Sequence, residues 1–239
     1  MEIQTQLKKL RLHGMSESWQ TLTETRKLTA LTLSEGMEIL LQSEEEERDN
    51  RRFERLHKNA HFRYQASIEE LHMDAARGMD KPLVNLLAKG DYLRNGESIL
   101  ITGSTGCGKS FLASAMGNKA CTQGYKVAYY NVQKLLVKTK MCRADGTIFK
   151  FMDKISKTDL LILDDFGLTH LDNQHRMDLL EIMEDRHGKA STIIASQLPV
   201  ATWYEVIGEQ TIADAILDRL IHTSHRVELK GESLRIKKR

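Results

Sequence analysis

Proline, cysteine and long apolar runs are scarce in this chain of 239 residues. It contains two prolines, Pro82 and Pro199, so proline-rich linkers are absent. Three cysteines, Cys107, Cys121 and Cys142, lack the paired spacing of a zinc site, and their odd number favours a reducing compartment. No apolar run reaches membrane-spanning length, and the first residues do not resemble a secretion signal. We therefore expect a cytoplasmic protein with no membrane partner.

The charge balance excludes a polycation. The formal net charge is +2, so any surface for nucleic acid must come from local clusters of Lys and Arg. Hydrophobic residues make up 41% and charged residues 28% of the chain, which is ordinary for a globular protein. The length suits one α/β domain and a smaller helical domain.

A glycine-rich stretch at residues 103–110 carries the clearest chemical pattern. It reads GSTGCGKS and matches G-x-x-x-x-G-K-[ST], the phosphate-binding P-loop. An apolar run at 98–102 suits a buried strand before it, and residues 111–116 suit the start of a helix after it. Strand, glycine loop and helix is the context that the motif requires.

The residue types in this loop fit a bound triphosphate. Glycines let the backbone approach the phosphates, and the helix start adds unpaired N–H groups and its positive dipole end. Lys109 can reach the β- and γ-phosphates, and the Ser110 hydroxyl can ligate Mg²⁺. The candidate ATP contacts are Gly103, Ser104, Thr105, Gly106, Cys107, Gly108, Lys109, Ser110 and Phe111.

A pair of acids follows a second apolar run. Residues 160–163 are apolar and are followed by Asp164 and Asp165, the Walker B pattern, with Asp164 placed 55 positions after Lys109. A buried strand would deliver both carboxylates rigidly to the P-loop. We predict that Asp164 holds Mg²⁺ and that Asp165 orients or deprotonates the attacking water.

Two later positions are candidates for the same reaction. The strand predicted at 191–196 ends in polar residues, so Gln197, or else Ser196, could position water against the γ-phosphate as sensor I does in P-loop ATPases. Arg219 could stabilise a neighbouring subunit's γ-phosphate in trans, because a guanidinium spreads its charge over phosphate oxygens. The alternative for Arg219 is an ion pair with Asp214 or Asp218 within the chain.

The first 77 residues are predicted to form a helical domain that docks a partner or DNA, with a boundary near residue 78. We expect a helix that ends at His13-Gly14, and a capping box between Thr32 and Glu35. The further helices expected cover 15–27 and 34–60, with another start at 67–70.

The long helix carries a charged run that allows two interpretations. Glu44–Arg48 and Glu47–Arg51 can pair at a spacing of four residues on a solvated face. Alternatively, the run is part of a protein- or DNA-docking arm with interleaved aromatic residues. The cations of that arm would be Arg48, Arg51, Arg52, Arg55, Lys58 and Arg63.

From residue 78 onward, strands alternate with helices, which predicts an α/β fold with a five-stranded parallel sheet between two layers of helices. Gly103, Asp164 and Gln197 then share the edge formed by the carboxyl ends of the strands. The predicted strands are 98–102, 126–131, 159–165, 191–196 and 225–229. The predicted helices are 82–89, 132–142, 148–156, 173–188 and 211–223.

These motifs together resemble the AAA+ ATPases of the initiator and helicase-loader type, and among them the IstB-like transposition helper proteins. The Walker motifs alone are shared by many NTPases, whereas residues 213–220 followed by 230–233 are more specific to IstB-like and DnaC-like proteins. The resemblance covers nearly the whole chain and is carried by 103–110, 160–167, 192–199, 211–220 and 229–235.

The resemblance implies an AAA+ P-loop domain at 78–239 that hydrolyses ATP with Mg²⁺, with Arg219 as the arginine finger in a neighbour's site. It also implies a homo-oligomeric ring or spiral on duplex DNA, which deforms the DNA as a target and stimulates a transposase. The alternative implied partner is a replicative helicase, loaded through residues 1–77 as by DnaC-like proteins. A small-molecule kinase is a third interpretation, but no second substrate motif is visible.

The chain departs from common AAA+ patterns at several positions. Asp165 stands where many AAA+ proteins have Glu, and Gln197 stands where Asn is frequent. We expect no separate helical lid after the last strand, and Arg235 is the candidate for sensor II. The expected DNA contacts are phosphate contacts from a basic helix, or that helix is simply a solvated surface. The residues concerned are Lys134, Lys138, Lys140 and Arg143, with the basic tail at 235–239 as a further candidate.

Overall fold

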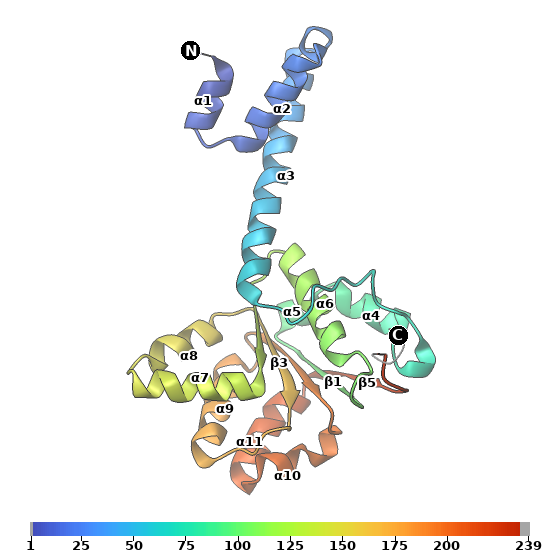
Figure 1. Cartoon of the computed structure of the whole chain (residues 1–239), viewed down its shortest axis with the longest axis vertical. Coiled ribbons are helices and arrows are strands. Elements are labelled where there is room, and N and C mark those ends of the chain that lie inside the picture. Colours follow the sequence, from blue (N-terminus) through green and yellow to red (C-terminus); the bar gives the residue numbers. More distant parts are fainter. Residues whose placement is uncertain (1, 235–239) are drawn as a thin grey trace. The chain divides into compact units, whose positions relative to one another are not determined.

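The computed structural model describes residues 2–234 and divides the chain into two compact units. The first unit is Met1–Arg55 and the second is Leu56–Arg239 (Figure 1). The predicted boundary near residue 78 therefore differs from the observed division, because residues 56–77 make their contacts with the second unit.

The first unit consists of helices, as predicted. Its small core is formed by Leu7, Met15, Leu22 and Leu40. Its elements are α1 (Ile3–Lys9), α2 (His13–Glu24), the 3₁₀ helix η1 (Lys27–Ala30) and the greater part of α3 (Leu33–Ala60).

One predicted helix end in this unit is wrong. His13 and Gly14 begin α2 instead of ending the helix before it. The glycine is needed for close packing rather than for a stop, since a Cβ on Gly14 would lie 2.2 Å from the Ser43 carbonyl oxygen of α3. The capping box is confirmed, because Thr32 N and Oγ1 donate to Glu35 Oε2 at 2.8 and 2.7 Å.

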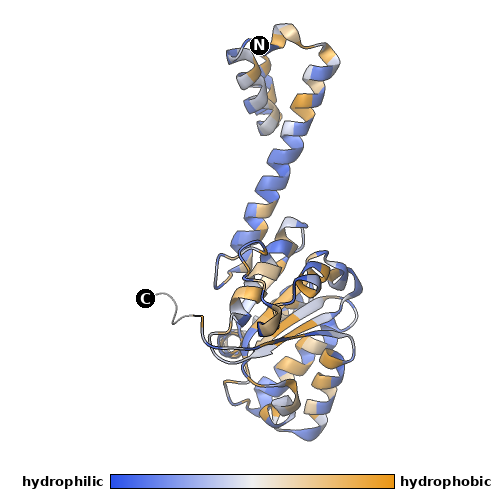
Figure 2. Ribbon diagram, turned by 90° about the vertical axis from the view of Figure 1, so that its right-hand side faces the viewer, coloured by the Kyte–Doolittle hydropathy of each residue, from blue (hydrophilic) through white to orange (hydrophobic). Residues whose placement is uncertain are grey.

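The charged part of α3 forms the ion pairs expected from its spacing, and the helix is hydrophilic along this stretch (Figure 2). Arg48 Nε lies 2.7 Å from Glu44 Oε1, and Arg51 Nε lies 3.1 Å from Glu47 Oε1. Glu44 is buried and also accepts the Met15 N–H at 3.2 Å. Burial alone would raise the pKa of Glu44, but the hydrogen bonds from Arg48 and Met15 hold it below its usual value.

The segment after α3 is part of the second unit, and the helix predicted to start at 67–70 does not form. Asn118 Nδ2 of α6 (Lys109–Thr122) donates to the Ala66 carbonyl at 2.9 Å. Ser67 N donates to Glu70 Oε2 at 2.9 Å, as at a helix start, but the chain continues as a turn. The local capping signal was correct, and the helix did not follow because this short stretch is held by contacts with α6.

The second unit is built on one parallel sheet with the order β2-β3-β4-β1-β5, so the predicted five-stranded α/β fold is confirmed. The strands are β1 (Ser98–Gly103), β2 (Val127–Asn131), β3 (Leu160–Phe166), β4 (Ser191–Ser196) and β5 (Ser224–Leu229).

Helices cover both faces of this sheet (Figure 1). Leu100, Leu161, Leu163 and Ile194 belong to one buried cluster with α7 to α11, whereas Ile162 faces Gly117 of α6 on the other side. The sequence does not predict the short helices α5 and α10 or the 3₁₀ segments. A stretch of five residues or fewer is too short to show a helical periodicity of apolar residues. The remaining elements are η2 (Ala75–Arg77), α4 (Lys81–Ala88), α5 (Asp91–Asn95), α7 (Val132–Ala144), α8 (Ile148–Ser156), α9 (Asn173–Arg186), η3 (Val200–Thr202), α10 (Trp203–Ile207) and α11 (Gln210–Ile221).

Across residues 2–234, no helix has both the length and the apolar character that crossing a bilayer would require.

Candidate nucleotide-binding site

The P-loop connects β1 to α6, as the motif predicts. Gly103 adopts φ 145° where a Cβ would lie 2.1 Å from the Leu229 carbonyl oxygen, so only glycine fits at this crossing. Lys109 is the first residue of α6 and is buried, and its Nζ donates to the Gly103 and Ser104 carbonyls at 2.8 Å each. The ammonium is thereby held against the loop that would surround the phosphates.

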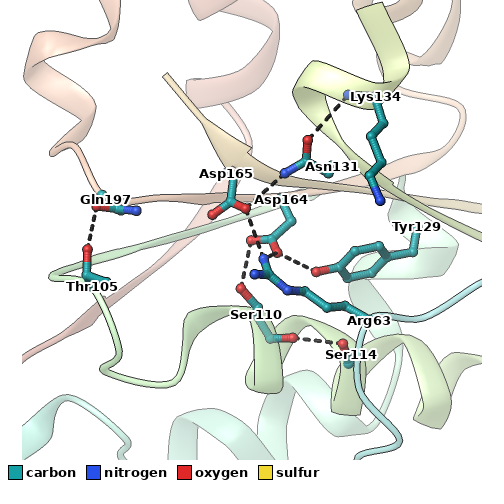
Figure 3. Close-up of polar contacts among 10 residues, drawn as sticks. All are labelled: Arg63, Thr105, Ser110, Ser114, Tyr129, Asn131, Lys134, Asp164, Asp165 and Gln197. Atoms are coloured by element: carbon teal, nitrogen blue, oxygen red, sulfur yellow. Dashed lines mark hydrogen bonds and ion pairs between the residues drawn. The ribbon is translucent and has the colours of Figure 1, made fainter. Parts of the chain in front are cut away.

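Asp164 lies fully buried at the end of β3 and beside the start of α6 (Figure 3). Ser110 Oγ donates to Asp164 Oδ1 at 2.9 Å, and the Tyr129 hydroxyl donates to Oδ2 at 2.5 Å. Burial and the negative charge of Asp164 raise the pKa of Tyr129, which keeps its hydroxyl a donor. The serine and aspartate oxygens form the donor set that suits Mg²⁺, so these residues fit the predicted ion.

Asp165 adopts the left-handed conformation, with φ 59°. Successive side chains of a regular strand point to opposite faces, but the β3–β4 register shifts between Leu163 and Phe166. This irregularity lets Asp164 and Asp165 both reach the same site. Asn131 Nδ2, at the end of β2, donates to Asp165 Oδ2 at 2.9 Å.

The predicted sensor position also reaches the P-loop. Thr105 Oγ1 donates to Gln197 Oε1 at 2.6 Å. The second candidate, Ser196, is buried and its hydroxyl donates to the Phe166 carbonyl at 2.8 Å. Of the two side chains, Gln197 borders the cavity described next, so the geometry favours it.

A cavity of about 560 Å³ lies over these groups and has the size of a small-ligand site. Lys109, Ser110, Asp165 and Gln197 supply polar walls. Its other walls come from Arg63, Tyr64, Thr105, Gly106, Gly108, Phe111, Leu168 and Leu234.

The chain after β5 returns over the P-loop. Leu234 N donates to the Gly106 carbonyl at 3.0 Å, and Ser104 Oγ donates to the Gly231 carbonyl at 3.2 Å. Leu234 thereby becomes an apolar wall that the sequence motifs did not predict. The proposed sensor II residue Arg235 and the basic tail at 235–239 lie outside the described residues.

Arg63 is one of the cations of the docking arm that the sequence allows as an alternative, but the structure places it in this site (Figure 3). Its Nη1 donates to Asp164 Oδ2 at 3.0 Å and to Asp165 Oδ2 at 2.9 Å. Burial alone would lower the pKa of Arg63, and the hydrogen bonds to the two acids raise it above its usual value. No local pattern could have found this contact, because Arg63 and Asp164 lie 101 positions apart.

Arg219 lies on α11 and contacts α9 of the same chain. Its Nη2 donates to Glu184 Oε1 at 2.7 Å and its Nη1 to the Ala215 carbonyl at 2.7 Å. Its acidic partner is therefore Glu184 rather than the predicted Asp214 or Asp218. Among the described residues that line the cavity, Arg219 does not occur.

The predicted DNA-contacting residues lie on α7, and three of the four are exposed lysines, Lys134, Lys138 and Lys140. Arg143 is also exposed, but it pairs with the buried carboxylate of Asp178 on α9, which gives it a structural role. Within residues 2–234, no group of three or more His, Cys, Asp or Glu side chains could hold a metal ion.

Comparison with known proteins extends these observations to the whole chain. The family model described as IstB-like ATP binding protein matches residues 5–239. The insertion sequence ATP-binding protein y4pL of Sinorhizobium fredii is 42% identical over 224 residues, which cover 94% of this chain and 91% of that protein. The insertion sequence IS21 ATP-binding protein of Pseudomonas aeruginosa is 28% identical over 238 residues, which cover 100% of this chain and 90% of that protein.

Solved structures agree with the fold of the second unit. The DnaC helicase loader superposes with a TM-score of 0.60 at 19% identity and covers 70% of this chain and 98% of its own. AMPPCP-bound DnaA from Aquifex aeolicus superposes with a TM-score of 0.59 at 20% identity. The match covers 72% of this chain and 52% of the DnaA chain. The chain has the P-loop AAA+ fold and belongs to the IstB-like ATP-binding protein family.

Proposed function

We propose that the protein is an Mg²⁺-dependent ATPase that assembles on duplex DNA, deforms it as a transposition target and stimulates a partner transposase. The observation that carries the proposal is the convergence of the P-loop, Asp165 and Gln197 on one cavity, with Asp164 bound to Ser110 beneath it. Family membership and relatives named as insertion sequence ATP-binding proteins support the transposition context.

Each group in the cavity has a role in this proposal. Lys109 would turn from the loop carbonyls to the β- and γ-phosphates, whose charge attracts its ammonium more strongly. Ser110 and Asp164 would hold Mg²⁺, which neutralises charge on the phosphates. Asp165 would accept a proton from the attacking water or orient it, and Gln197 would hold that water in line.

Arg219 would complete the active site of a neighbouring subunit. A guanidinium supplied to a γ-phosphate stabilises the charge that develops in the transition state. The ion pair with Glu184 and the hydrogen bond to the Ala215 carbonyl would hold the side chain until a neighbour presents its nucleotide. Assembly and hydrolysis are then coupled, because neither subunit has a complete site alone.

The exposed lysines of α7 would contact DNA phosphates. Each subunit contributes Lys134 and Lys138 at a spacing of four residues, which puts both on one helix face. An oligomer multiplies these contacts, so binding becomes tight, sequence-neutral and strongly salt-dependent. The first unit remains the proposed docking domain for the protein partner.

A complementation assay tests the shared active site. Lys109→Ala removes nucleotide binding, and Arg219→Ala retains it but loses hydrolysis. An equal mixture should recover about a quarter of the wild-type rate, since one interface in four pairs an intact P-loop with an intact Arg219. Lys150→Ala, an exposed substitution on α8, is the control. An inactive mixture that still forms mixed oligomers would contradict the shared site.

The partner is tested separately by co-purification. A complex with a transposase, and none with a hexameric replicative helicase, is the expected result. The reverse would support the helicase-loader alternative.

A further inference from the structure

Arg63 stands in the nucleotide cavity although it belongs to no nucleotide-binding motif of the sequence. It lies three residues after the end of α3, within the second unit. Its Nη1 bridges Asp164 Oδ2 at 3.0 Å and Asp165 Oδ2 at 2.9 Å. The side chain is 39% exposed and lines the cavity together with the P-loop residues Lys109 and Ser110.

The residues around Arg63 hold it in this position. The Phe62 ring contacts Tyr129 at a centroid distance of 6.4 Å and occupies the space that a side chain on Gly117 would need. The Tyr64 ring contacts Phe111 of α6 at 6.1 Å. With an aromatic anchor on each side, Arg63 is directed to the two acids by the packing of the segment.

The charges in the cavity change when a magnesium nucleotide enters. Asp164 Oδ2, which now accepts from Arg63, belongs to the carboxylate that fits Mg²⁺ together with Ser110. A divalent cation held there would repel the guanidinium, so the attraction of Arg63 to this acid would fall. A terminal phosphate bound in this cavity would offer a pair of oxygens that a guanidinium can bind in bidentate fashion.

We propose that Arg63 is a specificity-determining residue that exchanges Asp164 and Asp165 for the terminal phosphate of ATP. The inference rests on the proposed nucleotide site and deepens it. Because ADP lacks that phosphate, Arg63 makes the site prefer ATP. The exchange also moves the segment that continues directly from α3, so this segment reports which nucleotide is bound.

Binding measurements on the full-length protein test the role of Arg63. Dissociation constants are measured with Mg²⁺ for ADP and for a non-hydrolysable ATP analogue. Arg63→Ala should weaken binding of the ATP analogue about tenfold, as expected for a lost charge-assisted contact, and change ADP binding less than about twofold. The dissociation constant of Arg63→Lys for the ATP analogue should lie between those of the wild type and Arg63→Ala, because lysine keeps the charge and lacks the planar guanidinium.

Arg94→Ala is the matched control, since Arg94 is exposed and pairs with Asp91 on its own helix. It should leave both constants unchanged, and circular dichroism melting verifies that each variant is folded. In the wild type, amide hydrogen exchange over residues 61–66 should differ between the ATP analogue and ADP, and this measurement needs no variant.

The outcomes separate this inference from simpler roles. Tighter ATP binding by Arg63→Ala would overturn it and make Arg63 only a competitor of Mg²⁺ for the acids. If Arg63→Ala loses the same affinity for both nucleotides, or loses none for either, the inference is also overturned. A wild-type protein that binds no nucleotide would reject the proposed function and this inference with it.

Discussion

Asn131 joins Asp165 to the first turn of α7. Its Nδ2 donates to Asp165 Oδ2 at 2.9 Å, while its Oδ1 caps the helix by accepting the Lys134 N–H at 3.3 Å (Figure 3). One side chain therefore contacts both the acid proposed to act on water and the helix proposed to contact DNA.

This link predicts that Asn131 transmits DNA binding to hydrolysis. Asn131→Ala should leave ATP binding unchanged and reduce the stimulation of hydrolysis by duplex DNA toward none. It should also lower the free energy of unfolding by about 1 kcal/mol through the lost helix cap. Asn131→Ser keeps a capping hydroxyl but not the reach to Asp165, so it should restore stability without restoring stimulation. Full stimulation in Asn131→Ser would contradict the link.

The lysines of α7 should determine the salt dependence of DNA binding. Replacing Lys134 and Lys138 by Ala should reduce the slope of log K against log salt by about 2, since each phosphate contact contributes about 0.9. The measurement is fluorescence anisotropy with a labelled duplex at several salt concentrations. The same double substitution at Lys150 and Lys154 of α8 is the control and should leave the slope unchanged.

Arg143 should behave differently from these lysines, because it neutralises the buried carboxylate of Asp178. Arg143→Ala should lower the free energy of unfolding by about 2 kcal/mol, the cost of leaving a buried acid without its cationic partner and with only the Gln174 amide as donor. Urea denaturation measures this change. If Arg143→Ala keeps its free energy of unfolding but binds DNA more weakly, Arg143 contacts DNA as the sequence predicts.

The Ser110–Asp164 pair predicts how nucleotide binding depends on Mg²⁺. Chelation of Mg²⁺ by EDTA should weaken ATP binding to the wild type at least about tenfold, because the phosphates lose the neutralising cation. Asp164→Asn removes a charged oxygen ligand, so its ATP binding should be weak with or without Mg²⁺. Calorimetric titration in both conditions measures the difference. A full Mg²⁺ response in the variant would show that Asp164 does not hold the ion.

The sequence predicts those features of the fold and the site that leave a pattern among neighbouring residues. The P-loop, Asp164, the five strands and the pairs along α3 each follow from spacing within a few residues. The backbone irregularity at Asp165 carries no such signal, because it arises from the register shift between β3 and β4.

The missed site residues come from distant segments. Arg63, Tyr129 and Leu234 reach the cavity from the segment after α3, from β2 and from the end of the described chain. Arg63 was grouped with the arginines of the charged run because it follows them in sequence. Its aromatic neighbours, Phe62 and Tyr64, pack against Tyr129 and Phe111.

Glu44 predicts an acid-sensitive first unit. Its pKa is lowered in the folded chain, so its ionised form contributes stability at neutral pH, and this contribution is lost as the pH falls below about 4, the ordinary range of a glutamate. Amide hydrogen exchange of α2, corrected for intrinsic rates, should therefore show earlier opening at low pH than at pH 7. Glu44→Gln should already open more readily at pH 7 and respond less to acid.

Assembly is the central claim, and sedimentation velocity tests it most directly. The wild-type protein is mixed with a short duplex, Mg²⁺ and either ADP or a non-hydrolysable ATP analogue. The account predicts large protein–DNA oligomers with the ATP analogue, and only small species with ADP or without DNA. A single subunit that sediments identically under all of these conditions would contradict it.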